Sequence, residues 1–165
     1  MADLELRDGD MVTEPGRSLC SELWSDMEVR YADDPTAPET NGETDDLRNE
    51  ELVPPDGRFV IAYQDGEPVA CGAIRRHDDD TAEIKRMWVR PGARGRGFAK
   101  VVLRELESTA VARGYHALVL ETGLRQPEAL ALYESHGYTT IPNFGFYKES
   151  PLSVCYRKDL PSPNP

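Results

Sequence analysis

Apolar residues recur along this chain in two patterns, which separate expected strands from expected helices. Short apolar runs such as 59–63 (FVIAY) are typical of strands in a sheet. Apolar residues four positions apart mark one face of a helix, as at Leu19, Leu23, Met27 and Tyr31. Helices are therefore predicted over 15–31 and 98–113, and a third begins at Pro127 and ends at Gly137. The runs predict strands over 4–7, 58–63, 68–76, 82–89, 117–121, 138–141 and 153–158.

The order of these elements predicts one mixed α/β (α+β) sheet. The pair Asp65-Gly66 is a strong hairpin signal, and Asp78-Asp79-Asp80 marks a second turn, so three antiparallel strands form a meander. The strand at 82–89, the helix at 98–113 and the strand at 117–121 then form a strand–helix–strand unit. Such a unit implies a parallel pair with a right-handed crossover. A final hairpin completes a single domain over 1–165.

The stretch 83–100, EIKRMWVRPGARGRGFAK, carries the strongest functional signal. A strand is followed by a glycine-rich turn and the start of a helix. Glycines let the backbone approach an anion closely, and the first turn of a helix offers unpaired N–H groups and a favourable dipole. Arg94 and Arg96 can add charge-assisted hydrogen bonds. The stretch is therefore predicted to bind phosphate, although it lacks the patterns of a Walker loop or a dinucleotide fingerprint.

The same turn resembles the coenzyme A signature of the GNAT family of N-acetyltransferases, Gln/Arg-x-x-Gly-x-Gly/Ala. Its three fixed places are filled by Arg94, Gly97 and Ala99. Downstream, ALALYESHGY at 129–138 resembles the family stretch that contains a tyrosine proton donor, here Tyr133. The resemblance covers 58–160, the expected acetyl-CoA-binding core. The stretches 120–133 and 142–155 also resemble a bacterial subgroup of small-molecule acetyltransferases. It implies that the strands at 82–89 and 117–121 splay apart to admit the co-substrate.

The resemblance also implies roles for individual residues. Tyr133 protonates the leaving thiolate, and Glu83 is the expected general base. Lys85 could instead simply pair with Glu83, and Glu121 or a water relay is the alternative base. The residues expected to hold acetyl-CoA are Met87, Trp88, Val89, Arg94, Gly95, Arg96, Gly97, Phe98, Ala99, Lys100, Gln126 and Tyr133.

Charge and composition narrow the choice of partners. The net charge of −11 argues against a nucleic acid, and no apolar run is long enough to span a membrane. Seven basic residues between Lys85 and Arg104 form a local excess that suits an anionic co-substrate. Three scattered cysteines and three scattered histidines show no metal-ligand spacing, and the acidic N-terminus does not resemble a signal peptide, so we expect a cytoplasmic protein without a metal. A homodimer is possible by resemblance to the family.

The acceptor side is expected in the first third of the chain, 1–57. Family members commonly line the acceptor site with the segment that corresponds here to the acidic loop 32–51. The aromatic residues Phe144, Phe146 and Tyr147 are further candidates for its wall.

Three functions remain open from the sequence. The first is acetyl-CoA-dependent acetylation of a small-molecule primary amine by direct attack in a ternary complex. The second is acetylation of a protein or peptide at a lysine or N-terminus, and the third is a non-catalytic acyl-CoA sensor on the same fold.

Overall fold

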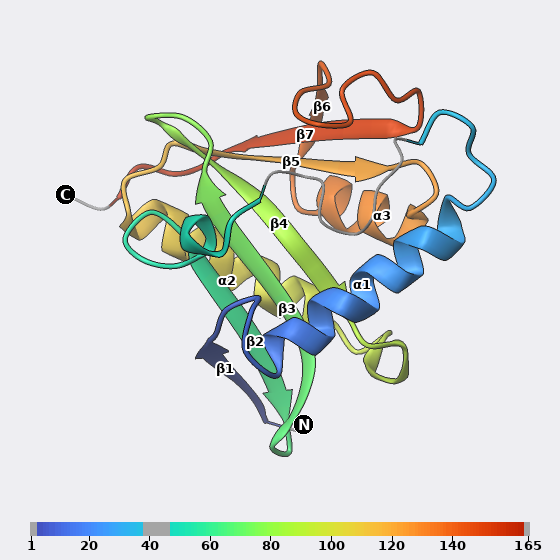
Figure 1. Ribbon diagram of the computed structural model, residues 1–165. Coiled ribbons are helices and arrows are strands. Elements are labelled where there is room, and N and C mark those ends of the chain that lie inside the picture. The colour runs from blue at the N-terminus through green and yellow to red at the C-terminus, as the bar shows by residue number, and fades with distance from the viewer. Residues whose placement is uncertain (1–2, 38–46, 164–165) are drawn as a thin grey trace.

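The computed structural model describes residues 3–37 and 47–163 as a seven-stranded sheet with helices on both faces (Figure 1). The strands are β1 Leu4–Asp8, β2 Arg58–Gln64, β3 Glu67–Arg76, β4 Thr81–Val89, β5 Ala117–Gly123, β6 Thr139–Ile141 and β7 Ser153–Asp159. The described α-helices are α1 Gly16–Arg30, α2 Phe98–Ala112 and α3 Pro127–Ser135, and 3₁₀ helices cover Asn49–Leu52 and Pro91–Ala93.

The strand order is β1-β2-β3-β4-β5-β7-β6, and only β4 and β5 run parallel. The predicted meander, parallel unit and final hairpin are therefore confirmed. The hairpin turn between β2 and β3 has the expected chemistry, because both Asp65 and Gly66 adopt positive φ. The end of the acidic loop 32–51 leads into the 3₁₀ helix at Asn49–Leu52, and residues 38–46 lie outside the described residues.

The two central strands separate after only four paired positions. Their ladder begins at Thr81 opposite Ala117 and ends at Ile84 opposite Leu120. The remainder of β4, from Lys85 to Val89, continues to pair with β3 on its other side. The splayed central strands expected from the sequence are thus present, and in Figure 1 β4 and β5 diverge toward α3.

A β-bulge lies on β4 where the strands diverge. Cys71 pairs with Trp88 and Ala73 pairs with Lys85, so Arg86 and Met87 together lie opposite Gly72. Arg86 takes φ 60°, in the left-handed region. Beyond the bulge the side chains of β4 therefore change the face on which they lie.

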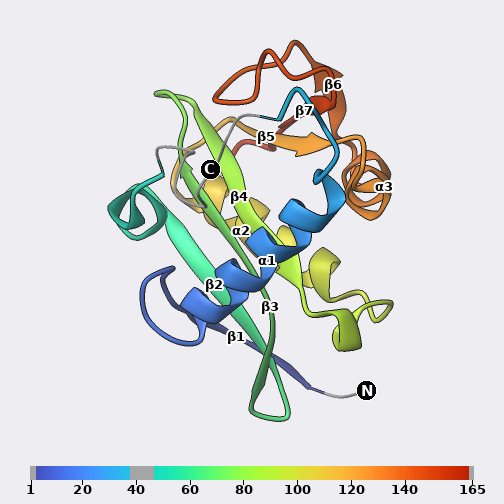
Figure 2. The same cartoon turned by 45° about the vertical axis from the view of Figure 1, so that its right-hand side comes forward.

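Helices cover the two faces of the sheet unequally. Figures 1 and 2 show α1 crossing one face and α2 lying against the other. The main core lies on the α2 face, where Val102, Leu103 and Leu106 of α2 are fully buried, and α3 joins this layer through Tyr133. A second cluster lies under α1 and includes Leu19, Phe59 and Trp88. The described residues contain no helix long and apolar enough to cross a membrane.

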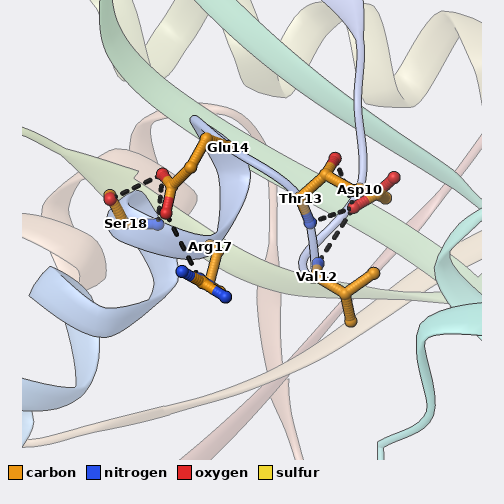
Figure 3. Close-up of polar contacts among 6 residues, drawn as sticks. All are labelled: Asp10, Val12, Thr13, Glu14, Arg17 and Ser18. Carbon is orange, nitrogen blue, oxygen red and sulfur yellow. Dashed lines mark hydrogen bonds and ion pairs between the residues drawn. The ribbon is translucent and has the colours of Figure 1, made fainter.

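The start of α1 is built from local polar contacts (Figure 3). The Asp10 carboxylate accepts hydrogen bonds from the backbone N–H groups of Val12 and Thr13, at 2.9 and 2.7 Å. The Glu14 carboxylate accepts from the hydroxyl of Ser18 at 2.6 Å. These bonds satisfy backbone N–H groups ahead of the helix and a hydroxyl in its first turn, and they favour a helix start at this point.

Candidate active site

A cleft of about 400 Å³ occupies the gap between β4 and β5. Its walls come from five parts of the fold: α1 and the residues after it, the end of β4, the end of β5, α3, and the loop between β6 and β7. The β4–β5 ladder stops at Ile84, so the edge of β4 that follows faces this gap. That edge can pair with an extended ligand.

The predicted phosphate turn leads directly into α2. Gly95 and Gly97 both have positive φ, 78° and 80°, which explains why glycine is needed at these places. Gly97 precedes the first residue of α2. The first hydrogen bond of the helix runs from the Val101 N–H to the Gly97 carbonyl, at 3.2 Å. The N–H groups of Phe98, Ala99 and Lys100 therefore lack acceptors within the helix. This is the geometry that binds an anion.

The side chains of the turn divide into a buried and an exposed set. Phe98 packs into the main core, which anchors the start of α2. Arg94 is exposed; its Nε donates to the Val89 carbonyl at 3.1 Å, and its guanidinium lies 4.8 Å from the ring centroid of Trp88. Arg96 and Lys100 are exposed as well. The turn thus presents cationic side chains at the surface, and the packing of Phe98 in the main core fixes its backbone.

The three residues of β4 expected to meet the co-substrate face different ways. Met87 lines the cleft. Trp88 is 7% exposed and packs in the cluster under α1, while Val89 packs against the main core. The side chain of Trp88 therefore does not line the cleft, and its contribution, like that of Val89, would have to come from the backbone.

Tyr133 lines the cleft from α3. Its ring packs edge-to-face on Tyr138, with centroids 5.5 Å apart, and lies 6.2 Å from Tyr156. Burial raises the pKa of the Tyr133 hydroxyl above its usual range, so it stays protonated at neutral pH. The residue that the sequence indicated as a proton donor thus packs against two other tyrosine rings, carries its proton and lies at the cleft.

The two candidate bases lie in different settings. The carboxylate of Glu83 is buried, accepts a hydrogen bond from Arg75 Nε at 2.9 Å, and lies 3.8 Å from the Lys85 ammonium. Glu83 is absent from the described residues that line the cleft, whereas Glu121 is among them. The pairing of Lys85 with Glu83 is therefore present, and the closer partner, Arg75, is one that the sequence did not indicate.

A set of contacts joins the end of α1 to the start of α3 across the cleft. Gln126, at the N-cap of α3, donates to the Tyr31 hydroxyl at 3.3 Å. The guanidinium groups of Arg30 and Arg125 donate to each other's backbone carbonyls, each at 2.9 Å. Gly123 leaves room for Tyr31, because a Cβ there would lie 1.8 Å from the tyrosine hydroxyl. These contacts fix the wall that α1 contributes.

The basic cluster between Lys85 and Arg104 is not one patch around the co-substrate. Arg90 forms a two-point contact with Glu22 of α1, at 2.8 to 3.1 Å, and also donates to the Pro68 carbonyl at 2.8 Å. Lys85 and Arg86 line the cleft on the side of α1. Charge counting along the sequence could not separate these roles, because they depend on which face each residue takes after the bulge.

The aromatic residues expected to wall the acceptor site differ in where they lie. Tyr147 lines the cleft, Phe144 packs on His77 instead, and Phe146 is 48% exposed with its ring against Tyr147. From the acidic loop 32–51, Asp34 lines the cleft together with Ala37, and residues 38–46 lie outside the described residues. Sequence reasoning missed Trp24 and Tyr31 as wall residues, although aromatic residues on the face of a predicted helix were a usable signal.

The cysteines play no visible part in the cleft. Cys20, Cys71 and Cys155 are all free and buried, and none of them is among the described lining residues. Across 3–37 and 47–163, no group of three or more His, Cys, Asp or Glu side chains could hold a metal ion.

The fold and the cleft together define a class: a mixed sheet with a split parallel pair and a glycine turn that leads into a helix, as in acyl-CoA-dependent N-acyltransferases. The sequence pattern of the acetyltransferase (GNAT) family matches residues 18–138. The chain belongs to this family and is an N-acetyltransferase.

Similarity to known proteins, in sequence and in structure, supports this assignment. The chain is 41% identical over 110 residues to an IAA acetyltransferase of Azospirillum brasilense, covering 66% of this chain and 72% of that protein. A Klebsiella pneumoniae structure assigned as an acyl-CoA N-acyltransferase has a TM-score of 0.78 at 29% identity, over 97% of this chain and 99% of that one. A GNAT acetyltransferase of Elizabethkingia anophelis, solved with acetyl-CoA bound, shares the fold with a TM-score of 0.68 at 18% identity, covering 95% and 98%.

Proposed function

We propose that this protein transfers the acetyl group of acetyl-CoA to the primary amine of a small molecule by direct attack in a ternary complex. The observation that carries the proposal is the combination of three features: the edge of β4 that faces the gap to β5, Tyr133 at the same cleft, and the glycine turn that follows β4. The similarity to a protein named as an IAA acetyltransferase supports a small acceptor.

The cleft and the turn fit acetyl-CoA. The exposed N–H groups at the start of α2, with Arg94, Arg96 and Lys100, would hold the pyrophosphate. The edge of β4 that faces the gap near Met87 would pair with the pantetheine amides, and Gln126, which also lines the cleft, would contact the same arm. Bound acetyl-CoA supplies a thioester that is activated toward an amine.

In the proposed mechanism Tyr133 donates a proton to the departing thiolate. Its raised pKa makes the buried phenol a weaker acid than an exposed one. The pKa of the coenzyme A thiol would be raised in the same cleft for the same reason, because burial disfavours its charged thiolate. The pKa values of the phenol and the thiol therefore stay comparable. The phenol also cannot act as the base at neutral pH, because it is protonated there.

The amine must lose a proton before it attacks. Two observations favour Glu121 over Glu83 for this step: Glu121 lines the cleft, and Glu83 is engaged by Arg75. The strand register puts both carboxylates on the same face of the sheet, because Glu83 pairs with Val119, two residues before Glu121 on β5. Transfer through a water molecule to either carboxylate is compatible with this arrangement.

The test of the proposed function is release of free thiol from acetyl-CoA in the presence of a panel of small amines. Initial rates with both substrates varied should give intersecting lines, as expected for a ternary complex. Tyr133→Phe should keep the affinity for acetyl-CoA and lower kcat by about tenfold to a hundredfold or more. Parallel lines would contradict direct attack, and unchanged turnover in Tyr133→Phe would remove this residue from the mechanism.

The base is tested with a matched pair of variants. Glu121→Gln should alter the acid limb of the kcat/KM profile, whereas Glu83→Gln should lower stability and leave that limb in place. Both changes remove one carboxylate from the same face of the sheet, so they control for the loss of charge. If Glu83→Gln altered the acid limb and Glu121→Gln left it in place, Glu83 would be the base instead.

A further inference from the structure

The bulge on β4 brings two consecutive basic residues to the same cleft. In an unbroken strand Lys85 and Arg86 would point to opposite faces. Here Arg86 takes φ 60°, and both residues line the cleft. Non-glycine residues at positive φ are uncommon and concentrate at functional sites. The backbone therefore adopts an unfavourable conformation at the residue that carries a guanidinium into the cleft.

An aromatic ring from α1 holds this guanidinium. The central carbon of Arg86 lies 5.1 Å from the ring centroid of Trp24, and Trp24 is itself a wall residue. A guanidinium over an aromatic face gains a cation–π interaction and is fixed in orientation. Its N–H groups then lie in a defined plane, which is the arrangement that binds a carboxylate through two parallel hydrogen bonds.

The charges around the acceptor side have both signs. Glu28, Asp34 and Glu121 line the cleft together with Lys85 and Arg86. A site for a simple cationic amine would gain from the carboxylates alone and would be weakened by two cations. A mixed lining fits a molecule that carries an amine and an anionic group together.

The phosphates of acetyl-CoA are the other possible partner of Arg86. The predicted phosphate turn, however, lies beyond the far end of β4 at the start of α2, with Arg94 over Trp88. Arg86 instead contacts α1, which covers the opposite face of the sheet from α2 (Figure 2). The position of Arg86 therefore favours the acceptor as the source of the anionic group.

We propose that the acceptor is an amino-acid-like molecule and that Arg86, set by the bulge and held by Trp24, binds its carboxylate. This inference rests on the proposed function, because it assigns the acceptor of the same transfer. Glu121 on the facing strand then lies on the amine side, so the carboxylate and the amine are oriented by residues on the two separated strands. Arg86 is a specificity-determining residue in this account.

The test compares each member of a panel of L-amino acids with its own carboxamide, in wild-type protein and with thiol release as the signal. The two members share side chain and amine and differ only in the carboxylate. The amine of a carboxamide is less basic, so a larger share of it is unprotonated and able to attack at neutral pH. This difference favours the carboxamide and therefore runs against the predicted preference for the acid. We expect kcat/KM to favour the free acid by about 10- to 100-fold, the range of a charge-assisted pair.

Variants assign the preference to a residue. Arg86→Gln should bring the acid-to-amide ratio close to one, and Arg86→Lys should keep part of it. The control is Arg104→Gln, which removes an exposed cation from α2 and should leave the ratio unchanged. The affinity for acetyl-CoA, measured by titration calorimetry, should be the same in wild type and Arg86→Gln.

The possible failures are distinguishable. Acetylation of amines without a preference for the acid, or a preference that survives in Arg86→Gln, would overturn this inference and leave the proposed function intact. A parallel loss of acetyl-CoA affinity in Arg86→Gln would assign Arg86 to the co-substrate phosphates and would also overturn it. Thiol release with the panel of small amines but with no amino acid or carboxamide would overturn this inference alone. Binding of acetyl-CoA without thiol release for any amine of either panel would overturn the proposed function, and this inference with it.

Discussion

The close packing around Gly72 makes a sharp prediction about the bulge. Gly72 lies opposite Arg86 and Met87, where β3 faces α2. A Cβ at this position would lie 2.5 Å from the Met87 sulfur, 2.8 Å from a Val102 methyl and 3.1 Å from a Leu106 methyl. Real Cβ atoms do not approach so closely, and two of the three neighbours are fully buried in the main core. Gly72→Ala must therefore displace packed side chains.

The expected cost of this overpacking is about 1–3 kcal/mol in the free energy of unfolding. For a chain of this size each kcal/mol lowers Tm by about 2–4 °C, so the fall should be about 2–12 °C. Since Met87 lines the cleft, the same displacement should weaken acetyl-CoA binding.

The assay is thermal and urea unfolding of Gly72→Ala beside a matched control. Gly92→Ala makes the same chemical change at an exposed site where a Cβ meets nothing within 4 Å and φ is not positive. Its stability should stay equal to wild type or rise slightly. A Gly72→Ala protein as stable as Gly92→Ala would refute the packing described for the bulge.

Two further predictions concern the anchoring of α1. The pKa of Asp10 is lowered, first by its hydrogen bond from the Thr13 backbone, so its ionised form stabilises the fold above the ordinary value of 3.8 and this contribution is lost as pH falls. Asp10→Asn should therefore be less stable than wild type at pH 7. The gap in unfolding free energy, measured by urea unfolding, should narrow as pH falls below about 5 and go on closing as pH falls through the lowered pKa of Asp10. A gap independent of pH would contradict this. Glu22→Gln should lose about 0.5–1 kcal/mol of stability, because it removes the partly exposed ion pair with Arg90. In the same unfolding assay, 1 M salt should reduce this loss by screening the pair. A loss that does not depend on salt would indicate another cause.

The elements and their pairing were largely predictable because they depend on local signals. The Asp65-Gly66 turn, Pro127 at the start of α3 and the glycines before α2 each impose a backbone geometry that the structure shows. The parallel pairing of β4 with β5 followed from the helix between them.

The details of the site were harder to predict because they arise from pairing between distant segments. The bulge exists only in the register of β3 against β4, although two consecutive basic residues, Lys85 and Arg86, interrupt the apolar strand and could have indicated it. The partner of Glu83 is Arg75 on the neighbouring strand, which no spacing rule identifies. The wall formed by α1 depends on how a helix crosses the sheet, which periodicity alone does not fix.

The most direct test of the central claim is thermal unfolding with and without saturating acetyl-CoA. At about 100 times Kd the ligand should stabilise the fold by roughly 2.7 kcal/mol, a rise of about 5–10 °C in Tm. Two glycine variants provide the comparison, because Gly97 in the phosphate turn and Gly66 in the hairpin have nearly the same φ, 80° and 81°, and open space around them. Gly66→Ala should keep the rise and Gly97→Ala should lose most of it. No rise in wild type at millimolar acetyl-CoA, or an equal rise in Gly97→Ala, would contradict the site described for this protein.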